Sequence, residues 1–319
     1  MLFPQMIAGP IVRFNEIADQ LESREDLETI DNKLLGMFRF GIGLAKKVLI
    51  ANVIGIEADR VFAMSEADLT TPIVWLGSLA YTFQIYFDFS GYSDMAIGLG
   101  KILGFKFPEN FNNPYVAQNI TDFWRRWHIT LGSFMRDYLY IPMGGSRVSS
   151  KRRLYFNLWA VFLLSGLWHG AAWNFVLWGA FHGLFLILDR LILLRMYKAL
   201  GKHLSILITF FITVVGWVLF RVESLDQAGY FMHKMFAFDF RPIEHHLDSS
   251  FWIILMIAIF FSFITITQLG LKIENKLFYA KSYSIKGYLV GFVLFLIAMI
   301  ISVSSIISSG FNPFIYFRF

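Results

Sequence analysis

The sequence contains no cysteine, little proline and few charged residues. Without cysteine among its 319 residues, the chain can form no disulfide, no thiolate metal site and no acyl thioester on its own sulfur. Only 8 residues are proline and 16% are charged, whereas 56% are apolar. Soluble domains have about 25% charged and about 45–50% apolar residues. The composition therefore excludes an ordinary soluble protein, a disordered chain and a collagen-like repeat.

Long runs of apolar, uncharged residues make up much of the sequence. A helix needs about 20 residues to cross the hydrocarbon core, and we expect spans at 203–220, 251–270 and 287–310. The nearly uncharged run 154–194 has 41 residues, about 61 Å as one helix, so it must fold back. Its glycines place the break at 165–172. The sequence lacks the segments of about ten residues with alternating polarity that form the strands of a transmembrane β-barrel. We predict an all-α, polytopic integral membrane protein forming one domain, residues 1–319.

Basic and acidic residues concentrate in different loops. The segment 147–153 has four basic residues, and 271–286 has four lysines and one glutamate. The segment 223–248 has five acidic and two basic residues. Because basic loops of membrane proteins stay in the cytosol, we expect 147–153 and 271–286 to be cytosolic and 226–248 to be external. The net charge of +5 follows from this topology and indicates no nucleic-acid partner.

Two aspartates lie in the apolar stretch 72–103, which is long enough to span a membrane. An aspartate at mid-bilayer costs about 2.5–3.5 kcal/mol, so Asp88 and Asp94 should face protein or water. We expect each to have a polar neighbour or to line a cavity. A structural ion pair and a role in a site are equally compatible with this position. The candidate ion-pair partners are three lysines: Lys46, Lys47 and Lys101.

His169 lies inside the longest apolar run, next to Trp168 and between two glycines. It is 15 residues beyond Leu154, about 22 Å along a helix, which is past the bilayer midplane. An ionisable residue at this depth indicates function, and a desolvated imidazole stays neutral and accepts a proton. A core histidine that bonds to a neighbouring helix is the structural alternative. We interpret His169 as a candidate general base.

A second candidate histidine lies in the segment 110–143, which is too charged to span. We expect a helix near residue 122 with Thr121 as its N-cap. Four residues then follow the spacing of one helix face: Trp124, Trp127, His128 and Leu131. This pattern is typical of an interfacial aromatic belt as well as of a site. Three arginines accompany it, either to hold an anionic group or to anchor the helix: Arg125, Arg126 and Arg136.

The remaining histidines give weaker signals. His182 is a weaker candidate within the apolar run. The run Glu244, His245 and His246 lacks the helical spacing of metal ligands, so we predict no metal site. The sequence has no H-E-x-x-H, G-x-S-x-G or phosphate-loop motif, and no Asp five residues after His128 or His169.

Five segments in order resemble the membrane-bound O-acyltransferases (MBOAT), specifically the bacterial branch of alginate O-acetylation proteins of the AlgI type. These segments are 2–14, 83–100, 119–147, 165–183 and 314–319. The resemblance implies a helical fold with a central channel. His169 matches the family's catalytic histidine and His128 matches its second site position. Family members carry further helices before the first segment, so we expect the chain to be N-terminally incomplete.

The resemblance also implies a reaction. The family transfers an acyl group, here expected to be acetyl, from a cytosolic acyl-CoA or acyl-carrier thioester to hydroxyls of an exopolysaccharide or envelope glycan. No cofactor is bound, and transfer is direct or through an external partner protein. The expected location is the bacterial inner membrane, in contact with lipid. Further channel-lining or substrate-positioning candidates are Trp124, Arg125, Arg126, Trp127, Arg136, Asp88, Asp94 and Trp168.

Two alternatives remain open from the residues alone. A transporter for an acylated sugar or lipid accounts equally well for buried aspartates and a histidine, and a non-catalytic scaffold is the other alternative. If the two histidines serve one site, the break at 166–170 must bring His169 toward His128 across one continuous cavity.

Overall fold

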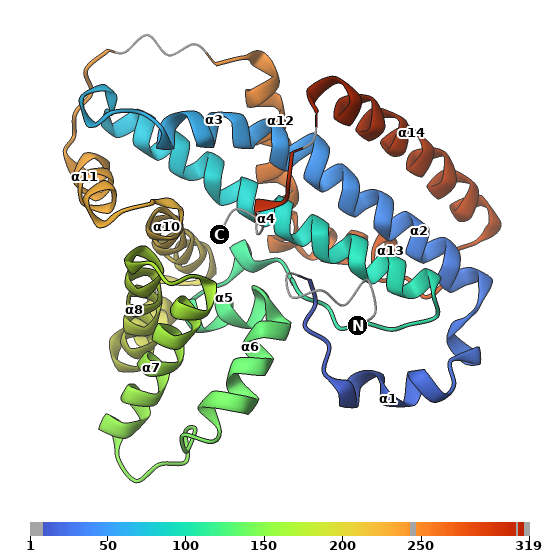
Figure 1. The fold of residues 1–319 in the computed structure, drawn as a ribbon, viewed down its shortest axis with the longest axis horizontal. Coiled ribbons are helices and arrows are strands. Elements are labelled where there is room, and N and C mark those ends of the chain that lie inside the picture. Colours follow the sequence, from blue (N-terminus) through green and yellow to red (C-terminus); the bar gives the residue numbers. More distant parts are fainter. Residues whose placement is uncertain (1–8, 243–246, 311, 316–319) are drawn as a thin grey trace.

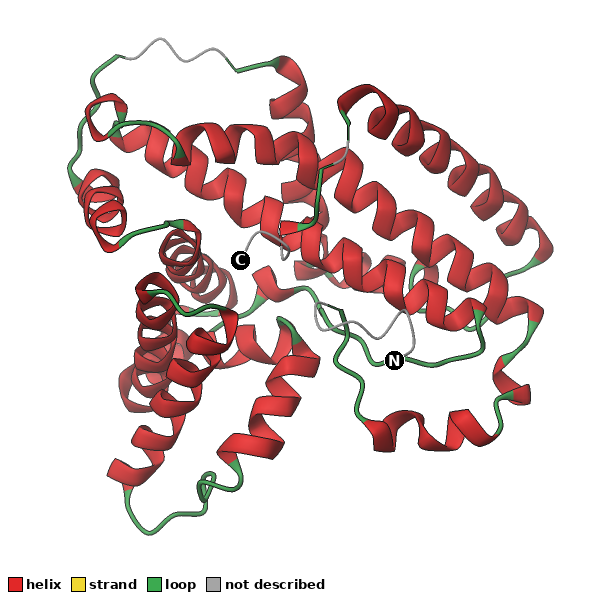
Figure 2. Cartoon of the chain, viewed as in Figure 1, coloured by secondary structure: helices red, strands yellow, loops and turns green. Residues whose placement is uncertain are grey.

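The computed structural model describes residues 9–242, 247–310 and 312–315, so Glu244, His245 and His246 lie outside the described residues. Within this part all regular elements are helical (Figures 1 and 2), which confirms the all-α prediction. Among the residues that the structure describes, four helices are long and apolar enough to cross a membrane: Trp173–Leu200, Lys202–Arg221, Ser249–Ile266 and Ile285–Ser309. These confirm the three spans expected from the sequence, the second of which ends at Ile266.

The α-helices follow one another along the chain, and two π-helical turns continue a helix into the next. Their bounds are α1 Phe14–Glu22, α2 Ile30–Ala45, α3 Asn52–Phe62, α4 Thr71–Ile102, α5 Ile120–Arg126, α6 Ile129–Met135, α7 Lys151–His169, α8 Trp173–Leu188, α9 Leu194–Leu200, α10 Lys202–Arg221, α11 Leu225–Phe236, α12 Ser249–Phe263, α13 Gln268–Leu277 and α14 Ile285–Ser309. The π-helical turns Lys46–Ala51 and Asp189–Leu193 join α2 to α3 and α8 to α9.

Helices α2 and α4 lie side by side (Figure 1), and facing glycines let their backbones approach closely. A Cβ on Gly36 would lie 2.6 Å from the carbonyl oxygen of Gly98, and one on Gly43 would lie 2.5 Å from that of Gly91. Small residues at repeated positions let membrane helices approach closely. This contact presents the polar face of α4 to α2.

The two aspartates of α4 face the protein interior, as predicted. Asp94 accepts hydrogen bonds from Arg39 Nε at 2.9 Å and from Lys46 Nζ at 2.6 Å. Asp88 accepts from Lys47 Nζ and, at 2.9 Å, from a backbone N–H of the C-terminal segment. Both aspartates are buried. These bonds offset the cost of removing each carboxylate from water.

The long apolar run folds back at the predicted place. Helix α7 ends at His169 and α8 begins at Trp173. The two helices pack backbone to backbone: a Cβ on Gly166 of α7, or on Gly179 of α8, would lie 2.3 Å from a carbonyl oxygen of the facing helix. The hairpin therefore has little freedom to slide, and it fixes the position of His169 at its turn.

The structure shows which span separates the acidic segment from the basic segment of the topology prediction. One candidate span, Ser249–Ile266, connects the segments 226–248 and 271–286, so they lie on opposite sides of a membrane that it crosses. Single cysteines at 147–153 and 271–286 should react with an impermeant maleimide only after the membrane is opened. Cysteines at 226–248 should react in intact spheroplasts, because the acidic loop is expected outside. Labelling of 226–248 and 271–286 from the same side would contradict this topology.

Candidate active site

His128 occupies a turn between two short helices and not a helix face. Helix α5 ends at Arg126 and α6 begins at Ile129, and His128 has a φ of 45°, in the left-handed region. Non-glycine residues seldom adopt this conformation, and those that do cluster at functional sites. The predicted helix face through Trp127, His128 and their neighbours is therefore wrong. The backbone N–H of Ile129 instead bonds to the carbonyl oxygen of Asn110 at 2.9 Å.

Asn110 fixes the orientation and the tautomer of His128. Its Oδ1 accepts from Thr130 Oγ1 at 2.8 Å and lies 3.0 Å from Nδ1 of His128, and its Nδ2 donates to Ser93 Oγ at 3.0 Å. Because an amide oxygen only accepts, Nδ1 of His128 carries the proton and Nε2 is the accepting nitrogen of the neutral ring. Asn110 gives no signal in the sequence, since no spacing rule links it to a histidine 18 residues away.

His169 lies at the turn of the α7–α8 hairpin among aromatic rings. Its ring meets those of Trp178 and Phe220 edge-on, with centroids 5.3 Å apart in both cases, and that of Trp168 at 5.0 Å. Phe220 is the residue before the last of α10. His169 therefore lies at the level where α10 ends. It is half-buried between the α7–α8 hairpin and α10.

A layer of aromatic rings connects the two histidines. Trp127, next to His128, packs on Trp217 with centroids 4.6 Å apart, and Trp217 stacks on Trp178 at 6.3 Å. Trp178 in turn contacts His169. The fold thus brings His128 and His169 into one region, although different elements carry them.

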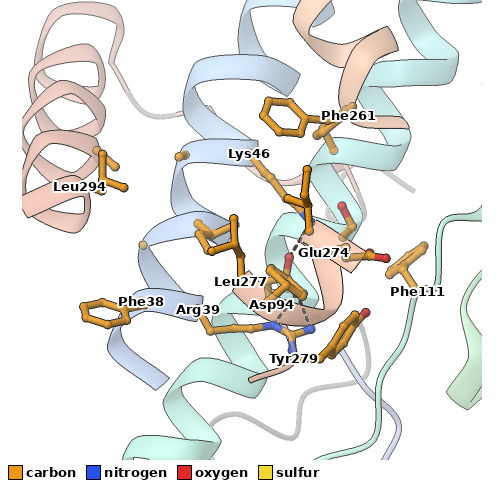
Figure 3. Close-up of a pocket in the computed structure, with 18 of the residues that line it drawn as sticks. Phe38, Arg39, Lys46, Asp94, Phe111, Phe261, Glu274, Leu277, Tyr279 and Leu294 are labelled. Carbon is orange, nitrogen blue, oxygen red and sulfur yellow. Dashed lines mark hydrogen bonds and ion pairs between the residues drawn. The ribbon is translucent and has the colours of Figure 1, made fainter. Parts of the chain in front are cut away.

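A cavity of about 970 Å³ lies beside α2 (Figure 3), and its lining includes Asn110, the hydrogen-bond partner of His128. Its walls come from α2, α4, α12, α13 and α14 and are mainly apolar. It reaches Ser93 and Asn110, the residues that hold His128, but its lining includes neither histidine. This cavity therefore does not by itself link the two histidines, in contrast to the continuous cavity expected from the sequence.

Opposite charges are paired along the polar part of this cavity. Arg39 and Lys46 converge on Asp94 (Figure 3), and Arg39 Nη1 also donates to Glu109 at 2.8 Å. The guanidinium carbon of Arg39 lies 4.2 Å from the ring centre of Phe278. The network ties α2 to α4 and to the segment that follows α4. Because the charges of this network are paired and the cavity walls are mainly apolar, the cavity suits a mostly neutral molecule.

The predicted arginines contact acidic neighbours or solvent. Arg126 Nε donates to Asp122 at 2.9 Å, and Arg136 Nε donates to Asp137 at 2.6 Å, while Arg125 is exposed. Hydrogen bonds from Arg136 and then from Arg13 lower the pKa of Asp137 to about 2. In the described part of the chain, no group of three histidine, aspartate or glutamate side chains is placed to hold a metal ion.

The predicted N-cap of α5 was wrong by two residues. Asn119 is the N-cap, and its side chain accepts from the backbone N–H of Asp122 at 2.7 Å. Thr121 lies in the first turn and bonds to Asp189, which lies just after α8. A contact between residues so far apart along the chain has no local signal in the sequence.

Comparison with known proteins decides the family. Residues 1–222 match the family model of the membrane-bound O-acyltransferases. The chain belongs to the MBOAT family. This membership confirms the resemblance seen in the five sequence segments and agrees with the multi-pass helical structure.

Relatives of this MBOAT protein act on different polymers, according to their names. It is 48% identical over 237 residues to "Probable alginate O-acetylase AlgI" of Pseudomonas aeruginosa, covering 74% of this chain and 45% of that protein. It is 47% identical over 231 residues to the peptidoglycan O-acetyltransferase of Helicobacter pylori, covering 71% and 43%. It is 30% identical over 238 residues to the teichoic acid D-alanyltransferase of Bacillus subtilis, covering 69% and 59%. The chain spans about half the length of these relatives.

Proposed function

We propose that this MBOAT protein transfers an acetyl group from a cytosolic thioester to hydroxyls of an exopolysaccharide or another envelope glycan, directly or through an external partner protein. The observation that supports the proposal is the chain of packed rings that runs from Trp127, next to His128 on the α5–α6 turn, through Trp217 and Trp178 to His169 on the α7–α8 hairpin. The names of the relatives, which refer to alginate, peptidoglycan and teichoic acid, support an envelope polymer as acceptor.

In this proposal His169 is the general base and His128 orients the reactants. The acceptor hydroxyl attacks the thioester carbonyl while His169 takes its proton. The carbon–sulfur bond then breaks, and the proton passes to the leaving thiolate, so that an ester and a free thiol result. A positioned base contributes about 10²–10⁴-fold to such a rate. The rings of Trp178 and Phe220 against His169 support exclusion of water, which would otherwise hydrolyse the thioester.

We place the arm of the thioester donor in the cavity beside α2. Acyl-CoA and acyl-carrier proteins both present the acyl group on a long, neutral pantetheine arm. The apolar walls and the paired charges of Arg39, Lys46 and Asp94 suit such an arm, and the lining includes Asn110, which bonds to His128. The basic segment 271–286, expected on the cytosolic side, supplies part of its lining.

Filling this cavity should weaken donor binding. Ala45 lines it and Leu44 does not, so Ala45→Trp and Leu44→Trp place the same bulky side chain at neighbouring positions of α2, one inside the cavity and one outside it. Overpacking costs about 1–3 kcal/mol, so we expect Ala45→Trp to raise the KM for acetyl-CoA roughly 10- to 100-fold. Leu44→Trp should leave that KM close to the wild-type value. Steady-state kinetics in membrane vesicles measure both, and equal KM values for the two variants would contradict the donor site.

The acyl content of the envelope glycan tests the proposed function. Cells that lack the gene should lose ester-linked acetyl groups, and cells that regain the full-length gene should recover them. Vesicles containing the protein should also transfer radiolabelled acetyl from acetyl-CoA to added glycan, which a transporter or a scaffold cannot do. An acyl content that does not depend on the gene would contradict the proposal.

A further inference from the structure

Helix α8 and the turn that follows it hold α5 through two polar contacts. Asp189 Oδ2 accepts from both the backbone N–H and the hydroxyl of Thr121, each at 2.8 Å. Three residues further along α5, Trp124 Nε1 donates to Nδ1 of His182 at 3.3 Å. Asp189 and His182 are fully buried. We call these four residues the α5–α8 clamp.

A glycine of α10 makes room for the histidine of the clamp. A Cβ on Gly216 would lie 2.6 Å from Nε2 of His182. Because Nδ1 accepts the indole proton, the neutral ring carries its own proton on Nε2. Within the described residues, Nε2 of His182 and Oδ1 of Asp189 have no hydrogen-bond partner. Burying such groups is costly, and apolar residues of similar size would serve packing alone at least as well.

The clamp lies between the elements that carry the two histidines of the proposed site. Helix α5 leads into the turn at His128, whereas α8 is the hairpin partner of α7, which ends at His169 (Figure 1). Trp124 also packs edge-on against Trp178, with centroids 5.5 Å apart, and Trp178 contacts His169. A shift of α5 relative to α8 therefore moves one imidazole relative to the other.

We propose that His182 and Asp189 are positioning residues that fix His128 relative to His169. They act on α5 through Trp124 and Thr121 and do not touch the reacting atoms. The inference rests on the proposed function, because it takes the two histidines to form one site. A displacement of about 1 Å near a reacting centre lowers a rate about 100-fold, so loss of a clamp contact should reduce turnover.

A distance measurement tests the positioning directly. The chain has no native cysteine, so spin labels at Phe134→Cys on α6 and Leu167→Cys on α7, both exposed, report the separation of the two units by pulsed electron paramagnetic resonance. His182→Leu removes the acceptor of the Trp124 indole, and we expect a shifted or broadened distance distribution. His182→Asn is the matched variant, because its amide oxygen can replace Nδ1 as acceptor, and we expect the wild-type distribution.

Kinetics of unlabelled protein with acetyl-CoA and envelope glycan give the second readout. We expect His182→Leu to lower kcat about 10- to 100-fold without changing the KM for acetyl-CoA, and His182→Asn to keep most of the wild-type kcat. If His182→Leu does not reach the membrane, Trp124→Phe removes the same hydrogen bond from the other partner. The same shift in distance and loss of kcat are then expected from it.

Two results would overturn the positioning role. An unchanged distance distribution in His182→Leu would do so even if activity falls, because His182 would then act in another way. A wild-type kcat in His182→Leu would also overturn the positioning role. If the wild-type protein transfers no acetyl group, the proposed function fails instead, and the distance measurement alone decides whether the clamp positions the two units.

Discussion

Replacement of His169 by alanine is expected to abolish acylation of the envelope glycan while the protein remains in the membrane at normal abundance. The imidazole is the group proposed to take the proton of the attacking hydroxyl, and no other histidine lines the turn of the α7–α8 hairpin. Loss of a general base lowers a rate about 10²–10⁴-fold. The measurement is the ester-linked acetyl content of glycan from cells that carry each variant, with the protein quantified by immunoblot.

His203 provides the control for this experiment, and His128 provides a second comparison. His203 is exposed at the beginning of α10, and His203→Ala should leave acylation unchanged. His128 should tolerate asparagine better than glutamine, because asparagine adopts the left-handed backbone conformation of this position more readily. Undiminished acylation with His169→Ala would refute the proposed mechanism, and the transporter alternative would then gain weight.

Replacement of Asp94 by alanine is expected to cause the largest loss of stability among single substitutions in the charged network. Asp94 accepts from both Arg39 and Lys46, and Arg39 is almost fully buried. Removing one partner of a buried ion pair costs about 3–5 kcal/mol, and Asp94→Ala removes the carboxylate that Lys46 contacts and leaves Arg39 with Glu109 alone. We expect the Tm in detergent to fall by roughly 5–15 °C. Fluorescence-detected size-exclusion chromatography after heating measures this shift.

An exposed ion pair provides the matched control for Asp94. Arg24 Nε donates to Glu28 at 3.0 Å, and both side chains are more than a third exposed. Exposed pairs contribute about 0–1 kcal/mol, so Glu28→Gln should change the Tm little. Asp94→Asn keeps one acceptor oxygen and should fall between the two. Equal Tm values for Asp94→Ala and Glu28→Gln would show that the network does not stabilise the fold.

Patterns that depend on the local chain were predicted well from the sequence. Apolar runs of sufficient length located the spans, because crossing a bilayer needs a continuous apolar helix. The glycines around His169 located the end of α7 and the beginning of α8. The cost of an unpaired charge in lipid placed Asp88 and Asp94 in the interior, where the structure pairs them with Lys47 and with Lys46 and Arg39.

The predicted helix face that includes His128 was wrong because helical periodicity presupposes an unbroken helix. The spacing of Trp124, Trp127 and His128 fits one helix face, but the helix ends at Arg126. The interruption comes from Asn110, whose backbone oxygen takes the N–H of Ile129. A competing hydrogen bond from a distant segment leaves no periodic signal.

The sequence by itself determined that this protein is a helical membrane protein of the MBOAT family, because hydropathy and family motifs are properties of contiguous residues. Only the tertiary structure decided how His128 is held, which helices enclose His169, and where a cavity lies. Those features depend on contacts such as His128 with Asn110 and Thr121 with Asp189. Such contacts form when helices from different parts of the chain pack together, and packing depends on the shapes of all the side chains at once.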